Sequence, residues 1–227
     1  MKKPGLILLI SLFCFQAFVF ADTGEKIIYG ISPVGTAEYN DLGITEFEGK
    51  KVKLVTFHTR ATGFEDLEKI YSDPATGRPI RVERDIAFPV GKEYIVEDYV
   101  SKENTLIATK FVRNKKVKEY IIKSDGPIYN GVILPFYLRT IPGLDVGSTF
   151  TFRFPQKFTV NLVSIDEVNV PAGKFKAYHF VSVPKKFEIW ISNDKLRLPL
   201  KIYGLAGLNY KLVMKKYYSG KAQAGVK

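Results

Sequence analysis

The segment from Asn169 to Tyr203 reads NVPAGKFKAYHFVSVPKKFEIWISNDKLRLPLKIY and contains three stretches in which apolar residues alternate with others. Alternation with a period of two places successive side chains on opposite faces of a β-strand. Val170-Pro171-Ala172-Gly173 precedes the first stretch, with proline and glycine where a type I turn favours them. Ser192-Asn193-Asp194-Lys195 follows the second, and Asn and Asp side chains bond their own backbone in such corners. The segment therefore predicts consecutive antiparallel strands joined by tight turns.

The same pattern extends over the rest of the chain. Short runs rich in Tyr, Phe, Val, Ile and Thr suit a pleated, half-buried surface, and turn residues interrupt them about every 8–12 positions. We expect strands near 25–31, 43–48, 52–59, 67–72, 78–86, 93–100, 105–112, 117–123, 148–154, 158–168, 174–183, 187–191, 198–203 and 208–217. Because no long helices alternate with these strands, the sequence predicts an all-β fold: one antiparallel sheet that is strongly curved or barrel-like.

One segment departs from the strand pattern. Residues 130–139 lack period-two alternation, and their apolar side chains cluster. Proline is accepted in the first turn of a helix, so we expect a short helix that begins near Pro135. Such an element could plug the mouth of a curved sheet. We favour a connector that caps the core over a moving lid.

The first residues have the features of a signal peptide. Two lysines precede an apolar run from Leu6 to Phe20, and small residues flank a cleavage site after Ala21. The run is too short for a transmembrane helix, and Phe13 before Cys14 does not fit a lipoprotein signal. We predict export to the periplasm of a Gram-negative-type bacterium. The predicted organisation is a signal peptide over residues 1–21, a single β-rich domain over 22–218 and a flexible tail over 219–227.

The charge of the chain is strongly basic. Without the two leader lysines, the 34 basic side chains fall to 32 against 23 acidic ones, which leaves a net charge of +9. The excess is spread over several short clusters, which favours solvated strand ends. The alternative is attraction to anionic envelope lipid or polysaccharide, and thus peripheral membrane contact. We do not expect nucleic-acid binding from an exported protein.

The sequence lacks the residues that most catalytic mechanisms require. Cleavage after Ala21 removes the single cysteine, and no G-x-S-x-G or phosphate-binding glycine motif is present. The histidines, His58 and His179, stand far apart in the sequence and do not suggest a metal site. We predict no catalytic residue, no metal and no cofactor, and hence no enzyme. Paired carboxylates with glycosidase-like chemistry stay open as an alternative among 23 acidic residues.

Four residues of the opening segment have both structural and functional interpretations. His179 shares a strand face with Val181 and other apolar residues, so we expect a core histidine with satisfied hydrogen bonds. Trp190 is either an exposed stacking surface or a packing partner of Tyr178 on the neighbouring strand. Arg197 could pair with Asp194 or with a carboxylate or phosphate of a ligand. We favour the structural interpretation for His179, Asp194 and Arg197.

An ordered set of motifs runs through the chain: GEKIIY at 24–29 with Gly35, YSDPATGRP at 71–79, PIY at 127–129, YLRT at 137–140, VG at 146–147, VPAGKF at 170–175 and WISND at 190–194 with RLP at 197–199. This set resembles the domain-of-unknown-function 3108 family of exported bacterial proteins. The resemblance covers nearly the whole chain after residue 21. It implies a periplasmic, mostly antiparallel β fold, and it supplies no catalytic residue.

Two functional hypotheses follow from these patterns. The first is a carrier whose concave, aromatic sheet face holds a lipid or other amphipathic envelope ligand, which requires a cavity of at least a few hundred Å³. The second is a structural or assembly protein that contacts envelope proteins through strand edges or its basic surface. The sequence predicts no oligomeric state. The candidate ligand contacts are Tyr137, Arg139, His179, Trp190, Asp194 and Arg197.

Overall fold

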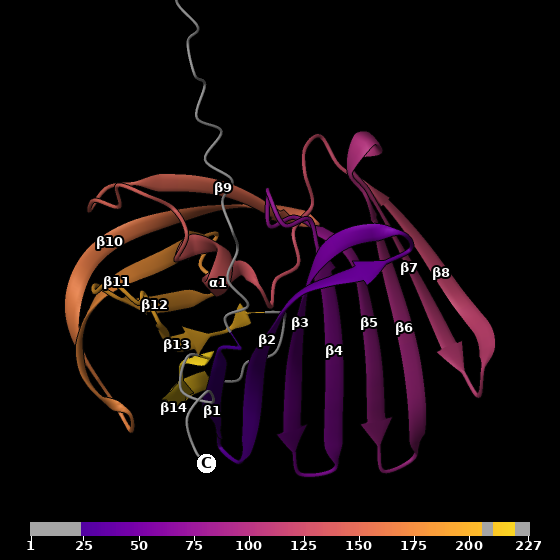
Figure 1. The fold of residues 1–227 in the computed structure, drawn as a ribbon, viewed down its shortest axis with the longest axis horizontal. Helices are drawn as coiled ribbons and strands as arrows, with labels where there is room; N and C mark the ends of the chain where they lie inside the picture. Colours follow the sequence, from indigo (N-terminus) through magenta and orange to yellow (C-terminus); the bar gives the residue numbers. More distant parts are fainter. Residues whose placement is uncertain (1–23, 206–210, 221–227) are drawn as a thin grey trace, which may run out of the picture.

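Fourteen strands form one antiparallel sheet in the computed structural model, which describes residues 24–205 and 211–220 (Figure 1). The strands are β1 (Lys26–Ser32), β2 (Gly35–Phe47), β3 (Lys50–Ala61), β4 (Phe64–Ser72), β5 (Pro79–Phe88), β6 (Gly91–Val100), β7 (Thr105–Val112), β8 (Lys115–Lys123), β9 (Thr149–Phe154), β10 (Gln156–Val170), β11 (Gly173–Val183), β12 (Glu188–Ser192), β13 (Pro199–Tyr203) and β14 (Lys211–Tyr218). A 3-10 turn, η1 (Ser101–Glu103), follows β6, and a short helix, α1 (Leu134–Leu138), precedes β9. The all-β prediction is confirmed.

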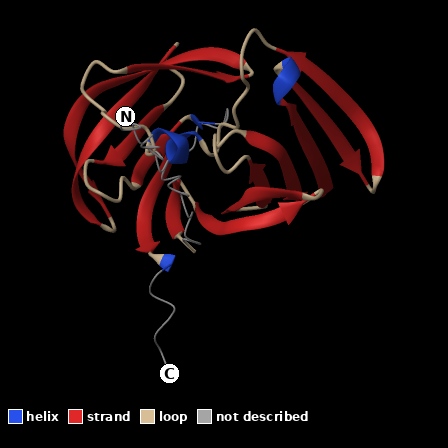
Figure 2. Ribbon diagram, turned by 45° about the horizontal axis from the view of Figure 1, so that its top comes forward, coloured by secondary structure: helices blue, strands red, loops and turns tan. Residues whose placement is uncertain are grey.

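The sheet is a meander whose two halves meet at one long-range pairing. Its strand order is β8-β7-β6-β5-β4-β3-β2-β1-β14-β13-β12-β11-β10-β9. β1 pairs with β14 in antiparallel register, with Lys26 opposite Tyr218. β8 and β9 therefore form the two outer edges, and the sheet curls without closing into a barrel (Figures 1 and 2). Residues 124–148 connect these two edges, and we call this segment the connector.

The predicted strand over 43–48 covers only the second part of β2. A β-bulge breaks the alternation within β2, so the first part lacks a continuous period-two pattern with the second. The pairing with β3 shifts between Asp41 and Ile44. Inside the bulge, Gly43 has a φ of 75°, and its backbone N–H donates to Asp41 Oδ1 at 3.0 Å. A bulge adds one residue to one strand and reverses the side-chain phase beyond it. Period-two counting therefore finds only the part of β2 after the bulge.

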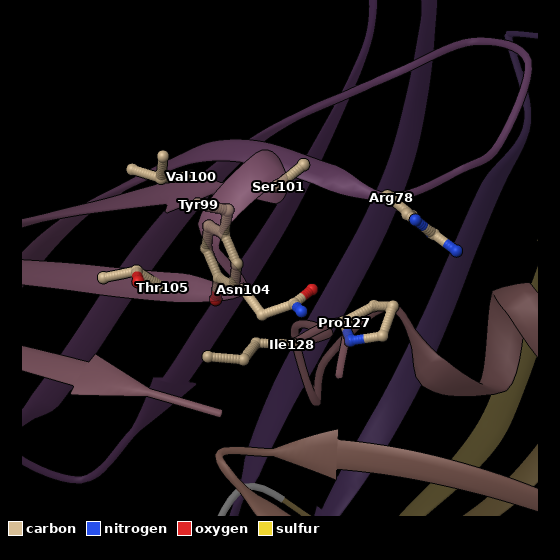
Figure 3. A pocket seen from close by; sticks show the side chains of 8 residues that line it. All are labelled: Arg78, Tyr99, Val100, Ser101, Asn104, Thr105, Pro127 and Ile128. Atoms are coloured by element: carbon tan, nitrogen blue, oxygen red, sulfur yellow. The ribbon is translucent and has the colours of Figure 1, made fainter. Parts of the chain in front are cut away.

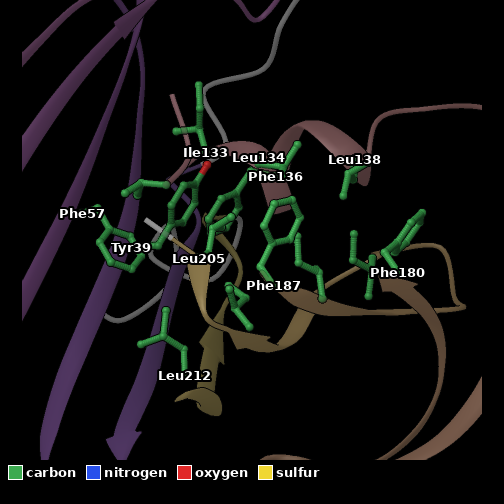
Figure 4. Packing of buried hydrophobic residues seen from close by; sticks show 14 of the residues in the cluster. Tyr39, Phe57, Ile133, Leu134, Phe136, Leu138, Phe180, Phe187, Leu205 and Leu212 are labelled. Carbon is green, nitrogen blue, oxygen red and sulfur yellow. The ribbon is translucent and has the colours of Figure 1, made fainter. Parts of the chain in front are cut away.

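The connector packs α1 against the concave face of the sheet. Leu134, Phe136 and Leu138 are buried, and Figure 4 shows them between side chains of the N-terminal and C-terminal halves. The ring of Phe136 stacks on Tyr39 of β2 with centroids 3.7 Å apart. Before the helix, Asn130 Oδ1 accepts hydrogen bonds from the backbone N–H groups of Val132 (2.9 Å) and Ile133 (3.3 Å). The predicted short helix at Pro135 is confirmed as an element of the core.

The predicted leader, with its cleavage site after Ala21, lies outside the described residues, and so does the tail from residue 221. Within 24–205 and 211–220, no helix has the length and apolar character needed to cross a membrane.

Candidate functional site

Two cavities lie between the sheet and the connector. The first cavity, of about 620 Å³, is lined by β3–β7, by residues 128–132 of the connector, and by Phe154, Phe158 and Phe187 from the other half of the sheet. The second cavity, of about 830 Å³, is lined by β2–β4, the β4–β5 loop, α1 and β9. Tyr129 lines both cavities and therefore lies at their common boundary.

A group of charged side chains faces the first cavity, and we call Asp66, Glu68, Arg84 and Glu97 the charged cluster. The strand register explains why they meet. Glu68 of β4 lies opposite Arg84 of β5, and Asp66 lies two residues away on the same face. Glu97 of β6 lies opposite Val82, which shares the face of Arg84. Directly paired residues on one face have Cβ atoms about 4.5–5.5 Å apart, so the sheet itself gathers three carboxylates around one guanidinium.

The hydrogen bonds of the charged cluster are incomplete. Arg84 Nη2 donates to Asp66 Oδ2, while Arg84 Nε lies 3.8 Å from Glu68 Oε1, beyond hydrogen-bond distance. Tyr99 donates its hydroxyl proton to Glu97 Oε2 at 2.7 Å. Asp66 Oδ1 and Arg84 Nε are buried and have no hydrogen-bond partner. Such groups are rare in folded proteins, and in a cavity they mark a candidate site.

Burial and neighbouring charges shift the acid–base behaviour of the cluster. Burial raises the pKa of Glu68 to about 8, and the negative charges of Asp66 and Glu97 act in the same direction against the opposing effect of Arg84. Burial alone would lower the pKa of Arg84, but the carboxylates of Glu68 and Asp66 outweigh it and raise the pKa. Glu68 therefore holds a proton near neutral pH while Arg84 stays charged.

The opposite side of the first cavity is aromatic. Phe154 of β9, Phe158 of β10 and Phe187 pack with ring centroids 5.5–6.3 Å apart. The cavity thus combines a charged patch on the N-terminal half of the sheet with an apolar wall on the C-terminal half. Ligand sites commonly show this combination of apolar walls with a few polar groups.

The second cavity has an aromatic boundary and a polar loop. Tyr129, Tyr137 and Phe152 make edge-to-face contacts with centroids 5.2–5.7 Å apart. In the β4–β5 loop, Asp73 Oδ1 accepts hydrogen bonds from the N–H groups of Ala75 (3.0 Å) and Thr76 (2.7 Å). These polar groups are already satisfied within the loop, so the second cavity offers fewer groups to a ligand than the first.

A third hollow, of about 10 Å³, lies beside η1 (Figure 3). It shares Tyr99 and Ile128 with the first cavity. Its volume corresponds to about one water molecule, so it cannot hold an organic ligand.

Among the six predicted contacts, Tyr137 lines the second cavity, whereas Arg139 and Arg197 anchor the connector. Arg139 Nη1 contacts both oxygens of Glu25 at 2.7 and 3.0 Å, and Nη2 donates to the carbonyl of Leu196 at 2.6 Å. Arg197 Nη1 donates to the carbonyls of Arg139 (3.3 Å) and Ile141. Both guanidinium groups therefore serve to hold backbone in place.

Asp194 closes the corner between β12 and β13, as its structural interpretation predicts. Its Oδ1 accepts hydrogen bonds from Ser192 Oγ (2.9 Å) and from the backbone N–H groups of Leu196 (2.9 Å) and Arg197 (3.0 Å). The carboxylate binds the backbone of Arg197 while the guanidinium of Arg197 binds the connector. Asp194 and Arg197 together therefore hold the β12–β13 corner against the connector.

The expectation of a core histidine at His179 holds for its satisfied hydrogen bonds and is wrong for its place in the core. The buried face of β11 carries Phe180, whereas His179 and Trp190 lie opposite each other on the other face. There the two rings stack 4.2 Å apart, and His179 Nε2 lies 2.9 Å from Glu188 Oε2. The alternation in the sequence did not reveal which face the connector covers. The partner proposed for Trp190, Tyr178, lies on the opposite face, opposite Ile191.

Sequence reasoning missed the charged cluster for a related reason. In β4, Asp66 and Glu68 share a face with Ile70, while the other face carries Leu67 and Tyr71. The second face is the more apolar one, so alternation predicts that the two acids point to solvent. The opposite charges of Glu68 and Arg84 are a signal in the sequence. That the two residues pair can be inferred only once the register of β4 and β5 is known.

The described residues contain no group of three or more His, Cys, Asp or Glu side chains that could hold a metal ion. A family model described as "Protein of unknown function (DUF3108)" matches residues 26–204. No curated protein and no solved structure matches the chain.

Proposed function

We propose that the chain, which belongs to the DUF3108 family of proteins of unknown function, is a non-enzymatic protein that binds an amphipathic ligand in its curved sheet. The observation that carries this proposal is the first cavity. Its volume of about 620 Å³ lies in the range of small-molecule sites, and its lining joins a charged patch to an apolar wall. A cavity built only to complete a core would be filled by side chains.

The proposed source of the ligand is the cell envelope. This part rests on the predicted leader over residues 1–21, which favours export to the periplasm. The net basic surface would favour approach to anionic membrane lipid during loading or delivery.

A fluorescence titration tests the proposal. N-phenyl-1-naphthylamine is a neutral dye that brightens in apolar sites, and we expect it to bind saturably. Val132→Trp places a large side chain where Val132 lines the first cavity and should weaken binding about tenfold or more. Val117→Trp is the matched control, because Val117 lies on β8 and is 54% exposed. Equal affinities in the two variants would contradict binding in this cavity.

A second candidate function, assembly with envelope proteins, is favoured by β8. This strand forms one edge of the sheet and is exposed along nearly its whole length. Exposed edges can accept a strand from another chain, although the lysines of β8 oppose nonspecific pairing. A photo-crosslinker at Tyr120 in cells tests this function. One discrete crosslinked protein supports it, and the absence of any crosslinked protein counts against it.

A further inference from the structure

We propose that the ligand of the first cavity carries a primary-amine headgroup, which binds as an ammonium ion against Asp66, Glu68 and Glu97. This inference rests on the function proposed above and assigns the chemistry of the ligand. The hydrocarbon part would lie along the aromatic wall.

The sign of the charge in the cavity favours a cation. Among the residues that line it, Asp66, Glu68 and Glu97 surround Arg84 as the one basic group of the cluster. The other basic lining residue, Lys186, is exposed to solvent. Even with Glu68 protonated, the two remaining carboxylates outnumber the guanidinium of Arg84. A carboxylate or phosphate headgroup would therefore meet a cluster of net negative charge, and Arg84 Nη2 is already engaged by Asp66, although the buried Nε of Arg84 has no partner.

The hydrogen-bonding capacity of the cluster favours a donor. Asp66 is only 4% exposed, and its Oδ1 lacks a hydrogen-bond partner although Oδ2 binds Arg84. An ammonium group has three N–H donors on a compact centre, which suits several carboxylates around one point. One hydrogen bond of this charged kind changes affinity about tenfold or more.

The placement of the rings favours a primary amine over a quaternary ammonium. Quaternary ammonium groups bind inside aromatic cages. The aromatic wall of Phe154, Phe158 and Phe187 comes from the C-terminal half of the sheet, whereas the charged cluster comes from β4–β6. Two aromatic lining residues, Phe64 of β4 and Tyr99 of β6, do come from the N-terminal half, and the hydroxyl of Tyr99 is bonded to Glu97. The charged end and the apolar end of the ligand are therefore assigned to different halves of the sheet.

Competition for the bound dye by four matched amphiphiles tests the inference. Dodecylamine, dodecanol, dodecanoate and dodecyltrimethylammonium share one chain length and differ in headgroup. At about pH 7, we expect dodecylamine to displace the dye at least about tenfold better than the other three. Equal displacement by any of the other three would overturn the amine inference and leave ligand binding intact. Displacement by none of the four would overturn the proposed function itself.

Variants then test the residues. Asp66→Asn and Glu97→Gln keep side-chain size and should reduce the preference for dodecylamine over dodecanol several-fold, because each removes one negative charge. Asp85→Asn is the matched control, since Asp85 is exposed on the opposite face of β5 from Arg84. A structural defect that reduces the fraction of folded protein would lower the apparent affinity for both ligands equally. The ratio of the two affinities would therefore stay unchanged. An unchanged ratio in both cavity variants would overturn the inference.

Discussion

Glu68 should make the stability of this protein fall as the pH rises. Its pKa is about 8 in the folded chain against an ordinary value of 4.5, with burial as the main cause. Asp66 on β4 and Glu97 on β6 raise it further, while Arg84 on β5 and the side-chain amide of Asn130 in the connector lower it.

The magnitude follows from the shift in pKa. Between pH 4.5 and pH 8 the folded chain keeps the Glu68 proton and the unfolded chain has released it, so raising the pH favours unfolding. The contribution is fully present below pH 4.5 and is lost as the pH rises through 8. One pKa unit corresponds to about 1.36 kcal/mol, which gives a loss of about 4 kcal/mol from pH 5 to pH 9. Glu68→Gln removes the titrating group and should remove this loss.

Urea unfolding at pH 5, 7 and 9, followed through the fluorescence of the single tryptophan, measures the effect. The free energy of unfolding of Glu68→Gln, relative to the unsubstituted chain, should rise by about 4 kcal/mol between pH 5 and pH 9. Asp85→Asn, at an exposed carboxylate on the same sheet, should show a much smaller change. Parallel pH profiles for Glu68→Gln and the unsubstituted chain would refute the assignment of a buried, protonated Glu68.

Three further substitutions test the packing of the connector and its anchors. Phe136→Ala removes the ring stacked on Tyr39 and should destabilise the fold by about 3–5 kcal/mol in urea unfolding; a cost below about 1 kcal/mol would mean that α1 is not part of the core. Arg139→Met leaves the mostly buried Glu25 carboxylate unpaired and should cost about 3–5 kcal/mol at neutral pH, with the loss reduced when Glu25→Gln is added; additive losses would contradict direct pairing. Asp194→Ala removes the acceptor of three hydrogen bonds and should lower the free energy of unfolding by about 2 kcal/mol, without changing dye affinity; weaker dye binding would show that the corner contributes to the ligand site.

The strands could be predicted because their sequence signal is local. Each of the fourteen observed strands overlaps a predicted range, and the helix at Pro135 was also expected. Pro171 and Gly173 mark a turn by their own backbone preferences, and residues 171–172 do form the turn between β10 and β11. The early half of β2 was missed because the bulge at Asp41 changes the side-chain phase within one strand.

The candidate site could not be predicted because it depends on which face of the sheet is concave. Alternation assigns residues to two faces but does not say which face the connector will cover. His179 is therefore expected in the core although it lies on the other face, and Asp66 and Glu68 line the cavity although they share the less apolar face of β4. Arg139 belongs to one of the sequence motifs, but its partner Glu25 lies 114 residues earlier in the sequence. Long-range pairings of this kind follow from register and packing.

Native mass spectrometry of the protein purified from its own cells tests the central claim most directly. The claim predicts a non-covalent mass increase from an amphiphile bearing a primary amine, and it predicts that Val132→Trp, with the first cavity obstructed, lacks this increase. A bare chain mass, or the same bound mass in both proteins, would contradict ligand binding in the curved sheet.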